Sequence, residues 1–147
     1  MIYKEEIKDL FSVSDDYYLA HCISADFGMG RGIVVEFNKR FDMKNRLIKK
    51  HPEFVKEWDD ISYKGTCLLE ERVLNLITKR NYWCKPTYQT LTNALIAMKI
   101  LASRYEIKKI AMPLIGCGLD RLEWSRVSQI IQETFRDMDI EILVCKL

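Results

Sequence analysis

Short apolar runs alternate along the first half of the chain with segments whose apolar residues recur on one side. The run at 17–23 predicts a strand. The segment 33–41 carries an apolar residue at every fourth position and predicts a helix, and 43–50 continues in helical form. The runs at 67–70 and 73–78, separated by two charged residues, predict two further strands.

The second half of the chain repeats this alternation. A one-sided apolar stripe from 88 to 102 predicts a long helix packed on a sheet, and 124–135 carries a second stripe. The run 109–115 is apolar nearly throughout, which is typical of a strand covered on both faces, although Pro113 argues against regular pairing there. Residues 140–144 alternate and predict a closing strand. This order favours an α/β sandwich with largely parallel central strands and helices on both faces.

Composition narrows the class of protein. Apolar residues make up 48% of the 147 positions and charged residues 30%, which excludes a disordered or fibrous chain. No linker or repeat divides the sequence, so we expect a single domain over 1–147. The net charge of +2 is too small to favour nucleic acid or an anionic membrane. Because the sequence has neither a membrane-spanning run nor the apolar stretch of a secretory signal, we expect a cytoplasmic protein with no membrane partner.

The five cysteines predict neither a disulfide scaffold nor a metal site. Their number is odd, no Cys-x-x-Cys occurs, and no histidine stands at a zinc-ligand spacing. Cys22 and Cys145 lie in apolar runs and are expected to be small buried hydrophobic residues. Cys117 lies within a glycine loop, where a helix terminus could activate a thiolate, but packing is the preferred interpretation.

Two glycine-rich loops follow predicted strands, SADFGMGRGI at 24–33 and IGCGLD at 115–120. In sandwiches of this class, ligands bind at the carboxyl ends of the strands, so the loops should face one cleft. Glycine allows close backbone approach, and a helix N-terminus presents free N–H groups, which favours phosphate. Two facing loops suit a diphosphate. Neither loop has a standard nucleotide-binding spacing, and the alternative is that the glycines only make tight turns.

Two charged residues at these ends are candidates for chemistry. Lys79 ends an apolar strand, where desolvation could leave a neutral amine able to attack an electrophilic carbon; the alternative is a solvated lysine. Asp120 follows the second loop and could transfer a proton, or it could cap a helix beginning near Leu122. His21 is expected to be a hydrogen-bonded core residue, and His51 a surface residue at a helix end.

Several segments together resemble macrodomains, and in particular the terminal ADP-ribose protein glycohydrolase branch, which includes DNA-de-ADP-ribosylating antitoxin macrodomains. The matching segments are Asp9-Leu10-Phe11, AHCIS at 20–24 with MGRGI, LITK at 76–79, KPTY at 85–88 and MPLIGCGLDRLEW at 112–124. The resemblance covers essentially the whole chain. It implies a three-layer α/β/α macrodomain sandwich with a mixed, largely parallel central sheet, which binds ADP-ribose and acts without a metal ion or another cofactor. We expect a monomer.

The resemblance also implies roles for individual residues. Lys79 matches a nucleophilic lysine that attacks the anomeric carbon of the distal ribose, and Asp120 matches its acidic partner in proton transfer. Three groups of positions match ADP-ribose contacts: the adenine end (Asp9, Leu10, and Leu147, which closes over the adenosine), the first phosphate and distal-ribose loop (Ser24, Gly28, Met29, Gly30, Gly32, Ile33), and the second loop (Leu114, Ile115, Gly116, Cys117, Gly118, Leu119).

The sequence departs from the family pattern in three places. Lys8 stands where many macrodomains have glycine, and Leu114 stands where relatives carry a basic residue. Both differences bear on the affinity for the adenosine end of the ligand. Trp83 and Cys84 give the chain its own substrate-facing segment.

The resemblance implies a hydrolase that removes ADP-ribose from modified protein carboxylates of the ADP-ribosyl-glutamate type, or from related esters such as O-acyl-ADP-ribose. ADP-ribosylated protein is then the partner. One alternative is a DNA ADP-ribosyl hydrolase, in which a run of cations could hold the nucleic acid backbone, although such runs usually form a solvated helical face. The other is a module that reads ADP-ribose without hydrolysing it. The cations of the run are Lys39, Arg40, Lys44, Arg46, Lys49 and Lys50.

Overall fold

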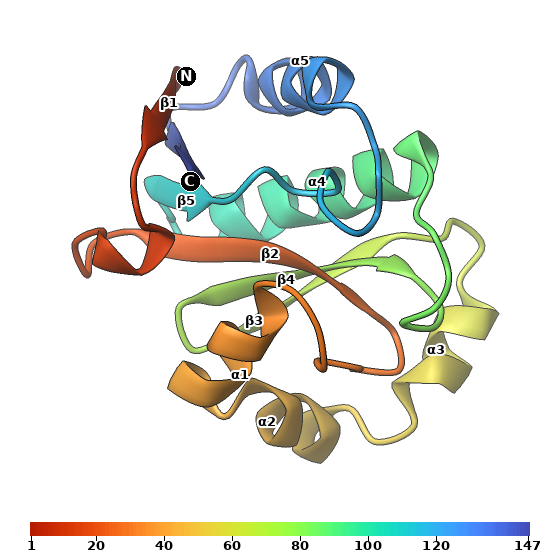
Figure 1. The fold of residues 1–147 in the computed structure, drawn as a ribbon. Helices are drawn as coiled ribbons and strands as arrows, with labels where there is room; N and C mark the ends of the chain where they lie inside the picture. Colours follow the sequence, from red (N-terminus) through yellow and green to blue (C-terminus); the bar gives the residue numbers. More distant parts are fainter.

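A six-stranded mixed sheet forms the middle of the structure, a computed structural model that describes residues 1–147 (Figure 1). The strand order is β1-β6-β5-β2-β4-β3. Every neighbouring pair is parallel except β3 and β4, which are antiparallel. The strands are β1 (Ile2–Ile7), β2 (Tyr18–Ser24), β3 (Thr66–Glu70), β4 (Val73–Lys79), β5 (Lys109–Met112) and β6 (Glu141–Lys146).

Helices cover both faces of the sheet. The long α4 (Tyr88–Arg104) and α5 (Trp124–Phe135) lie on one face, above the sheet in Figure 1. The shorter helices α1 (Val34–Phe41), α2 (Met43–Lys50) and α3 (Phe54–Asp60) lie on the other. Each face has its own apolar cluster, one containing Leu95 and Ile131 and the other Phe37 and Leu47. The predicted three-layer sandwich is confirmed. None of the helices combines the length and the apolar character needed to cross a membrane.

Helix α4 shows how local sequence fixes one layer. Thr87 and Thr90 form a reciprocal capping box in which Thr87 Oγ1 accepts from the Thr90 N–H at 3.0 Å and Thr90 Oγ1 accepts from the Thr87 N–H at 3.0 Å. Its apolar stripe is fully buried from Leu91 onward, including Leu95 and Met98, and Tyr88 is partly buried. The stripe predicted this helix, and the cap explains where it begins.

The structure corrects the predicted strands at two points. Strand β5 ends at Met112 rather than continuing to 115, because Pro113 has no N–H for the next ladder bond. Strand β6 is buried on both faces through its centre, because it lies between β1 and β5, so its residues do not alternate in exposure.

Three elements were not predicted. Strand β1 is a largely exposed edge strand with charged residues at its centre. The short 3₁₀ turn η1 (Leu10–Ser12) follows it. Helix α3 buries only Phe54 and Trp58, one turn apart, so its apolar pattern is short.

Three parallel strands end at the same edge of the sheet. Strand β2 ends at Ser24, β4 at Lys79 and β5 at Met112. Ser24 pairs with Lys79 across a shift in register that begins after Ile23. This edge therefore brings the start of both glycine loops close to Lys79.

Candidate active site

Lys79 and Asp120 form an ion pair at this edge of the sheet. Lys79 Nζ donates to Asp120 Oδ1 at 2.7 Å, and the two side chains are only 14% and 15% exposed. The surface pair Lys99–Asp137 has nearly the same separation, 2.8 Å, but its side chains are 33% and 81% exposed. Charges shielded from water interact more strongly than exposed ones. The two residues that sequence singled out for chemistry are thus in contact, in a partly buried setting.

The second glycine loop places Asp120 by its own backbone turns. Gly116 has a φ of +74°, and the Leu122 N–H donates to the Gly116 carbonyl at 2.7 Å. Helix α5 begins only at Trp124, with Glu123 at its N-cap. The alternative interpretation of Asp120 as a helix cap is therefore wrong, because its carboxylate turns to Lys79 instead.

The first glycine loop offers unused hydrogen-bond donors. The Gly28 N–H donates to the Asp26 carboxylate at 3.0 Å, whereas the N–H groups of residues 29–33 have no protein acceptor. These groups lead into the N-terminus of α1, where the helix dipole adds a partial positive charge. Such an arrangement suits an anion.

The two loops lie beside each other. A Cβ built on Gly32 would stand 3.5 Å from Leu119 Cδ1, which joins the end of the first loop to the second. In the second loop the N–H groups of residues 118–120 also lack a protein acceptor. Two sets of free donors therefore belong to neighbouring loops, and the second loop leads to the Lys79–Asp120 pair.

A sequence comparison decides the family. A family model described as Macro domain matches residues 52–131, and the chain is 41% identical over 142 residues to the human and bovine proteins named ADP-ribose glycohydrolase OARD1. The chain belongs to the macrodomain family. The human match covers 95% of this chain and 88% of its relative.

Solved macrodomain structures share the fold. The macrodomain of Thermus aquaticus DarG has a TM-score of 0.79 at 19% identity, covering 99% of each chain. The macrodomain of Mycobacterium tuberculosis DarG has a TM-score of 0.80 at 19% identity, covering 98% of this chain and 97% of the other.

The remaining predicted contact residues of this macrodomain differ widely in exposure. Asp9 is exposed and caps η1 by accepting from the Phe11 N–H at 3.0 Å, while Leu10 beneath it is buried. Ser24, Met29 and Ile115 are buried, Ile33 is 37% exposed, and Leu147 is 98% exposed at the end of the chain. Their contacts with a nucleotide stay predictions.

Two cysteines stand close to the pair and are held as thiols. Burial raises the pKa of Cys22 well above its usual range and that of Cys117 to about 11. Cys117 Sγ also donates to the Ile115 carbonyl at 3.3 Å. A thiol in this state is a poor nucleophile, which favours the packing interpretation. All five cysteines are free.

Sequence reasoning missed two residues, Asp26 and Lys85, whose side chains contact the loops. Asp26 joins the first loop to the segment after Lys79 through hydrogen bonds from Gly28 N and Tyr82 N. Lys85 Nζ donates to the Leu119 carbonyl at 2.6 Å, from the same segment to the second loop. The Asp-x-Gly spacing of 26–28 is the one sequence signal that favours such a turn.

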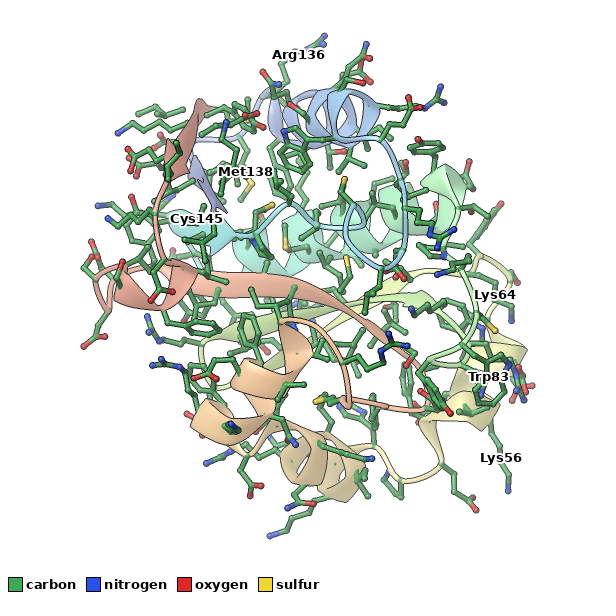
Figure 2. All side chains as sticks on the ribbon, in the orientation of Figure 1. Lys56, Lys64, Trp83, Arg136, Met138 and Cys145 are labelled. Carbon is green, nitrogen blue, oxygen red and sulfur yellow. The ribbon has the colours of Figure 1, made fainter.

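Between these two links lies an exposed aromatic pair. Tyr82 and Trp83 are 62% and 66% exposed, with an edge-to-face ring contact at 5.0 Å between centroids. Trp83 projects at the edge of the molecule (Figure 2). The segment that sequence assigned to the substrate side is therefore open to solvent.

The cation run of 39–50 belongs to the other end of the sheet. Arg46 pairs with Glu71 at 2.8 Å, in the turn that precedes β4, and Lys50 pairs with Glu70, the last residue of β3, at 2.9 Å. Lys79 is the last of the seven residues of β4, which places it about 20 Å from that turn at ~3.3 Å per residue. Arg40 pairs with Glu36 at 2.8 Å. Three of the six cations are thus already paired with carboxylates.

Proposed function

We propose that this macrodomain is an ADP-ribosyl hydrolase that releases ADP-ribose from modified carboxylate side chains of proteins, or from related esters such as O-acyl-ADP-ribose. The observation that carries the proposal is the shielded contact of 2.7 Å between Lys79 Nζ and Asp120 Oδ1 beside two loops with free N–H groups. The name of the OARD1 relatives, ADP-ribose glycohydrolase, supports the same reaction.

The two loops would hold the diphosphate. The free N–H groups of residues 29–33 and 118–120 donate to phosphate oxygens, and the α1 dipole adds electrostatic stabilisation. Asp9, Leu10 and Leu147 would contact the adenosine end. This placement leaves the distal ribose next to Lys79.

Lys79 would act as the nucleophile. Its amine gives a proton to Asp120 and attacks the anomeric carbon of the distal ribose. An N–C bond forms, the C–O bond to the carrier breaks, and the carrier leaves as a carboxylate. Asp120 passes that first proton to solvent, which is the net proton released when an ester is hydrolysed to a carboxylate. Water then loses a proton to the ionised Asp120 and adds to the same carbon, the N–C bond breaks, and Asp120 returns the proton to the lysine amine as free ADP-ribose leaves.

The experiment incubates the protein with glutamate-linked ADP-ribosylated protein and with ADP-ribosylated DNA, and follows free ADP-ribose by mass spectrometry. We expect release from the protein substrate, with Lys79→Ala at least about a hundredfold slower because the nucleophile is lost. Calorimetry should show that the variant still binds ADP-ribose. Lys99→Ala is the matched control, because it breaks a lysine–aspartate pair of similar length far from the loops.

Each other outcome has a defined meaning. Turnover by Lys79→Ala at the parent rate would refute the lysine mechanism. Release from DNA alone would change the carrier from protein to nucleic acid. Tight binding of ADP-ribose without release from either substrate would identify a reader.

A further inference from the structure

The carboxylate of Asp26 gathers donors from two separate segments. Its Oδ1 accepts from Ser24 Oγ and from the Gly28 N–H at 3.0 Å, both on the first loop side. Its Oδ2 accepts from the Tyr82 N–H at 3.1 Å, three residues after Lys79. One side chain therefore bridges the first glycine loop and the segment that leaves the strand of the proposed nucleophile.

The bridge stands where two parallel strands separate. The Ala25 N–H donates to the Lys79 carbonyl at 2.9 Å, and the Asp26 N–H donates to the Arg80 carbonyl at 3.2 Å. Beyond these bonds the two backbones have no further ladder contacts, and the Asp26 carboxylate makes the next connection. It thus extends the pairing of β2 and β4 past the ends of the strands.

The approach of the two segments is tight at one glycine. A Cβ built on Gly28 would stand 2.9 Å from Tyr82 Cβ and 3.3 Å from Asp26 Oδ1. The missing side chain lets the loop reach both. Because Gly28 gives its N–H to Asp26, the donors still free for a ligand begin at the following residue, Met29.

The surroundings of Asp26 favour its ionised carboxylate, which is the form that accepts these hydrogen bonds. Burial raises the pKa of its carboxyl, but the hydrogen bonds from Ser24 and from the backbone of Gly28 and Tyr82 outweigh it, and the pKa is lowered. Hydrogen bonds to an ionised acceptor are stronger than neutral ones. The bridge is therefore stronger than an ordinary turn contact.

We propose that Asp26 is a positioning residue for the hydrolase, a role that rests on the proposed function. It fixes the first glycine loop relative to the strand of Lys79, so that the free N–H groups of residues 29–33 face the diphosphate when the ribose meets the amine. It touches neither phosphate nor ribose itself.

Hydrogen exchange of the unmodified protein gives the first test. Although they lie outside helices and strands, the Gly28 and Tyr82 amides should exchange slowly without ligand and change little when ADP-ribose is added. The amides of residues 29–33 should exchange quickly and become protected by ADP-ribose. Fast exchange of Gly28 and Tyr82 in the free protein would overturn the proposal.

The second test is Asp26→Asn, which preserves shape but turns an amide N–H₂ toward at least one of the three donors. We expect about tenfold faster exchange at Gly28 or Tyr82, and an affinity for ADP-ribose about tenfold weaker, since a hydrogen bond to a charged group is lost. KM should rise in parallel while kcat stays within about threefold, because Lys79 and Asp120 keep their own contact. Asp137→Asn, which removes an exposed carboxylate paired with Lys99, should change none of these.

The outcomes separate the two proposals. If the parent protein releases ADP-ribose and Asp26→Asn matches it in affinity and KM, the positioning role is refuted and the proposed function stands. If the parent protein neither binds nor releases ADP-ribose, the proposed function fails and the positioning role fails with it. The exchange rates of Gly28 and Tyr82 then still decide whether the bridge itself exists in solution.

Discussion

The two glycine loops follow neighbouring parallel strands, yet they are held in different ways. The first is tied by the ionised Asp26 carboxylate, which accepts hydrogen bonds from Ser24 Oγ, Gly28 N and Tyr82 N. The second is tied by turns within its own backbone and by one exposed contact, from Lys85 Nζ to the Leu119 carbonyl. Only the second loop leads to a side chain paired with Lys79.

This difference suggests a division of labour in the proposed enzyme. A loop that only binds benefits from being fixed in advance, because ordering it on binding costs free energy. A loop that carries a proton acceptor must keep that group in contact with its partner while bonds form and break. Changes to the first loop should therefore act on affinity, and changes to Asp120 should act on turnover.

The largest expected effect comes from Asp120→Asn. An amide cannot take the proton of Lys79, so we expect kcat to fall by a factor on the order of 10² or more. The free donors of both loops remain, so the affinity for ADP-ribose should stay within about threefold. Single-turnover kinetics and calorimetry measure the two quantities.

Asp120→Asn and Asp26→Asn are expected to have opposite effects on turnover and on affinity. One should lose turnover and keep affinity, and the other should lose affinity and keep kcat. If Asp120→Asn instead weakens binding and leaves kcat unchanged, the division between the loops is wrong.

Most of the strands and helices along the chain, and the three layers, were predictable, because apolar periodicity reports burial directly; the order of the strands in the sheet was not predicted. The stripe of α4 and the run of β4 are clear for that reason, since both are buried along their length. Strand β1 was missed because an edge strand with charged residues has no such pattern. Helix α3 was missed because two buried residues do not establish a period.

The candidate site was predictable at its centre and not at its supports. Lys79 and Asp120 stand at strand and loop ends, and family resemblance marks both. Asp26 was missed because its importance lies in Tyr82 N, a backbone atom 56 residues away that no sequence pattern identifies. Backbone partners of this kind become visible only once the strands are placed side by side.

Acid should affect the strand that leads to the first loop and not the strand that leads to the second. Strand β2 contains His21, fully buried, bonded through Nε2 to Asn75 Oδ1 at 2.6 Å and stacked on Phe37, which confirms the expected core histidine. Strand β5 ends in the apolar Ile110, Ala111 and Met112. Only the first loop therefore follows a strand with a buried titratable group.

Burial lowers the pKa of His21 from 6.5 to about 4. The unfolded chain takes up a proton at higher pH than the folded protein, so stability is complete above about 6.5 and is lost as pH falls toward 4. At roughly 1.4 kcal/mol per pKa unit the loss is about 3 kcal/mol. Below pH 4 both states are protonated at this site and the loss stops growing.

Chemical denaturation between pH 7 and 4 tests this expectation. In His21→Gln the amide can keep a hydrogen bond to Asn75 but cannot titrate, so its stability should fall less steeply over that range than that of the parent. The carboxylates titrate equally in both proteins, so their effect cancels when the two slopes of stability against pH are compared. Equal slopes would show that His21 does not control the acid response.

The smallest effect, and the finest comparison, comes from two glycines of the first loop. Gly28→Ala would place a methyl group 2.9 Å from Tyr82 Cβ, so the loop must move away from the segment after Lys79. We expect a loss of about 1–2 kcal/mol in unfolding free energy, typical of overpacking. Thermal unfolding monitored by circular dichroism measures it.

Gly30→Ala is the matched control, because a methyl group there meets no atom within 4 Å. Its unfolding free energy should stay within about 0.5 kcal/mol of the parent value. If both variants lose the same stability, the loop responds to the loss of glycine flexibility in general rather than to contact with Tyr82. If only Gly28→Ala does, the close approach that Asp26 bridges is what holds the first loop. The close approach in the second loop is local by contrast, because a Cβ on Gly116 would stand 3.1 Å from Leu122 Cδ1, only six residues along the chain.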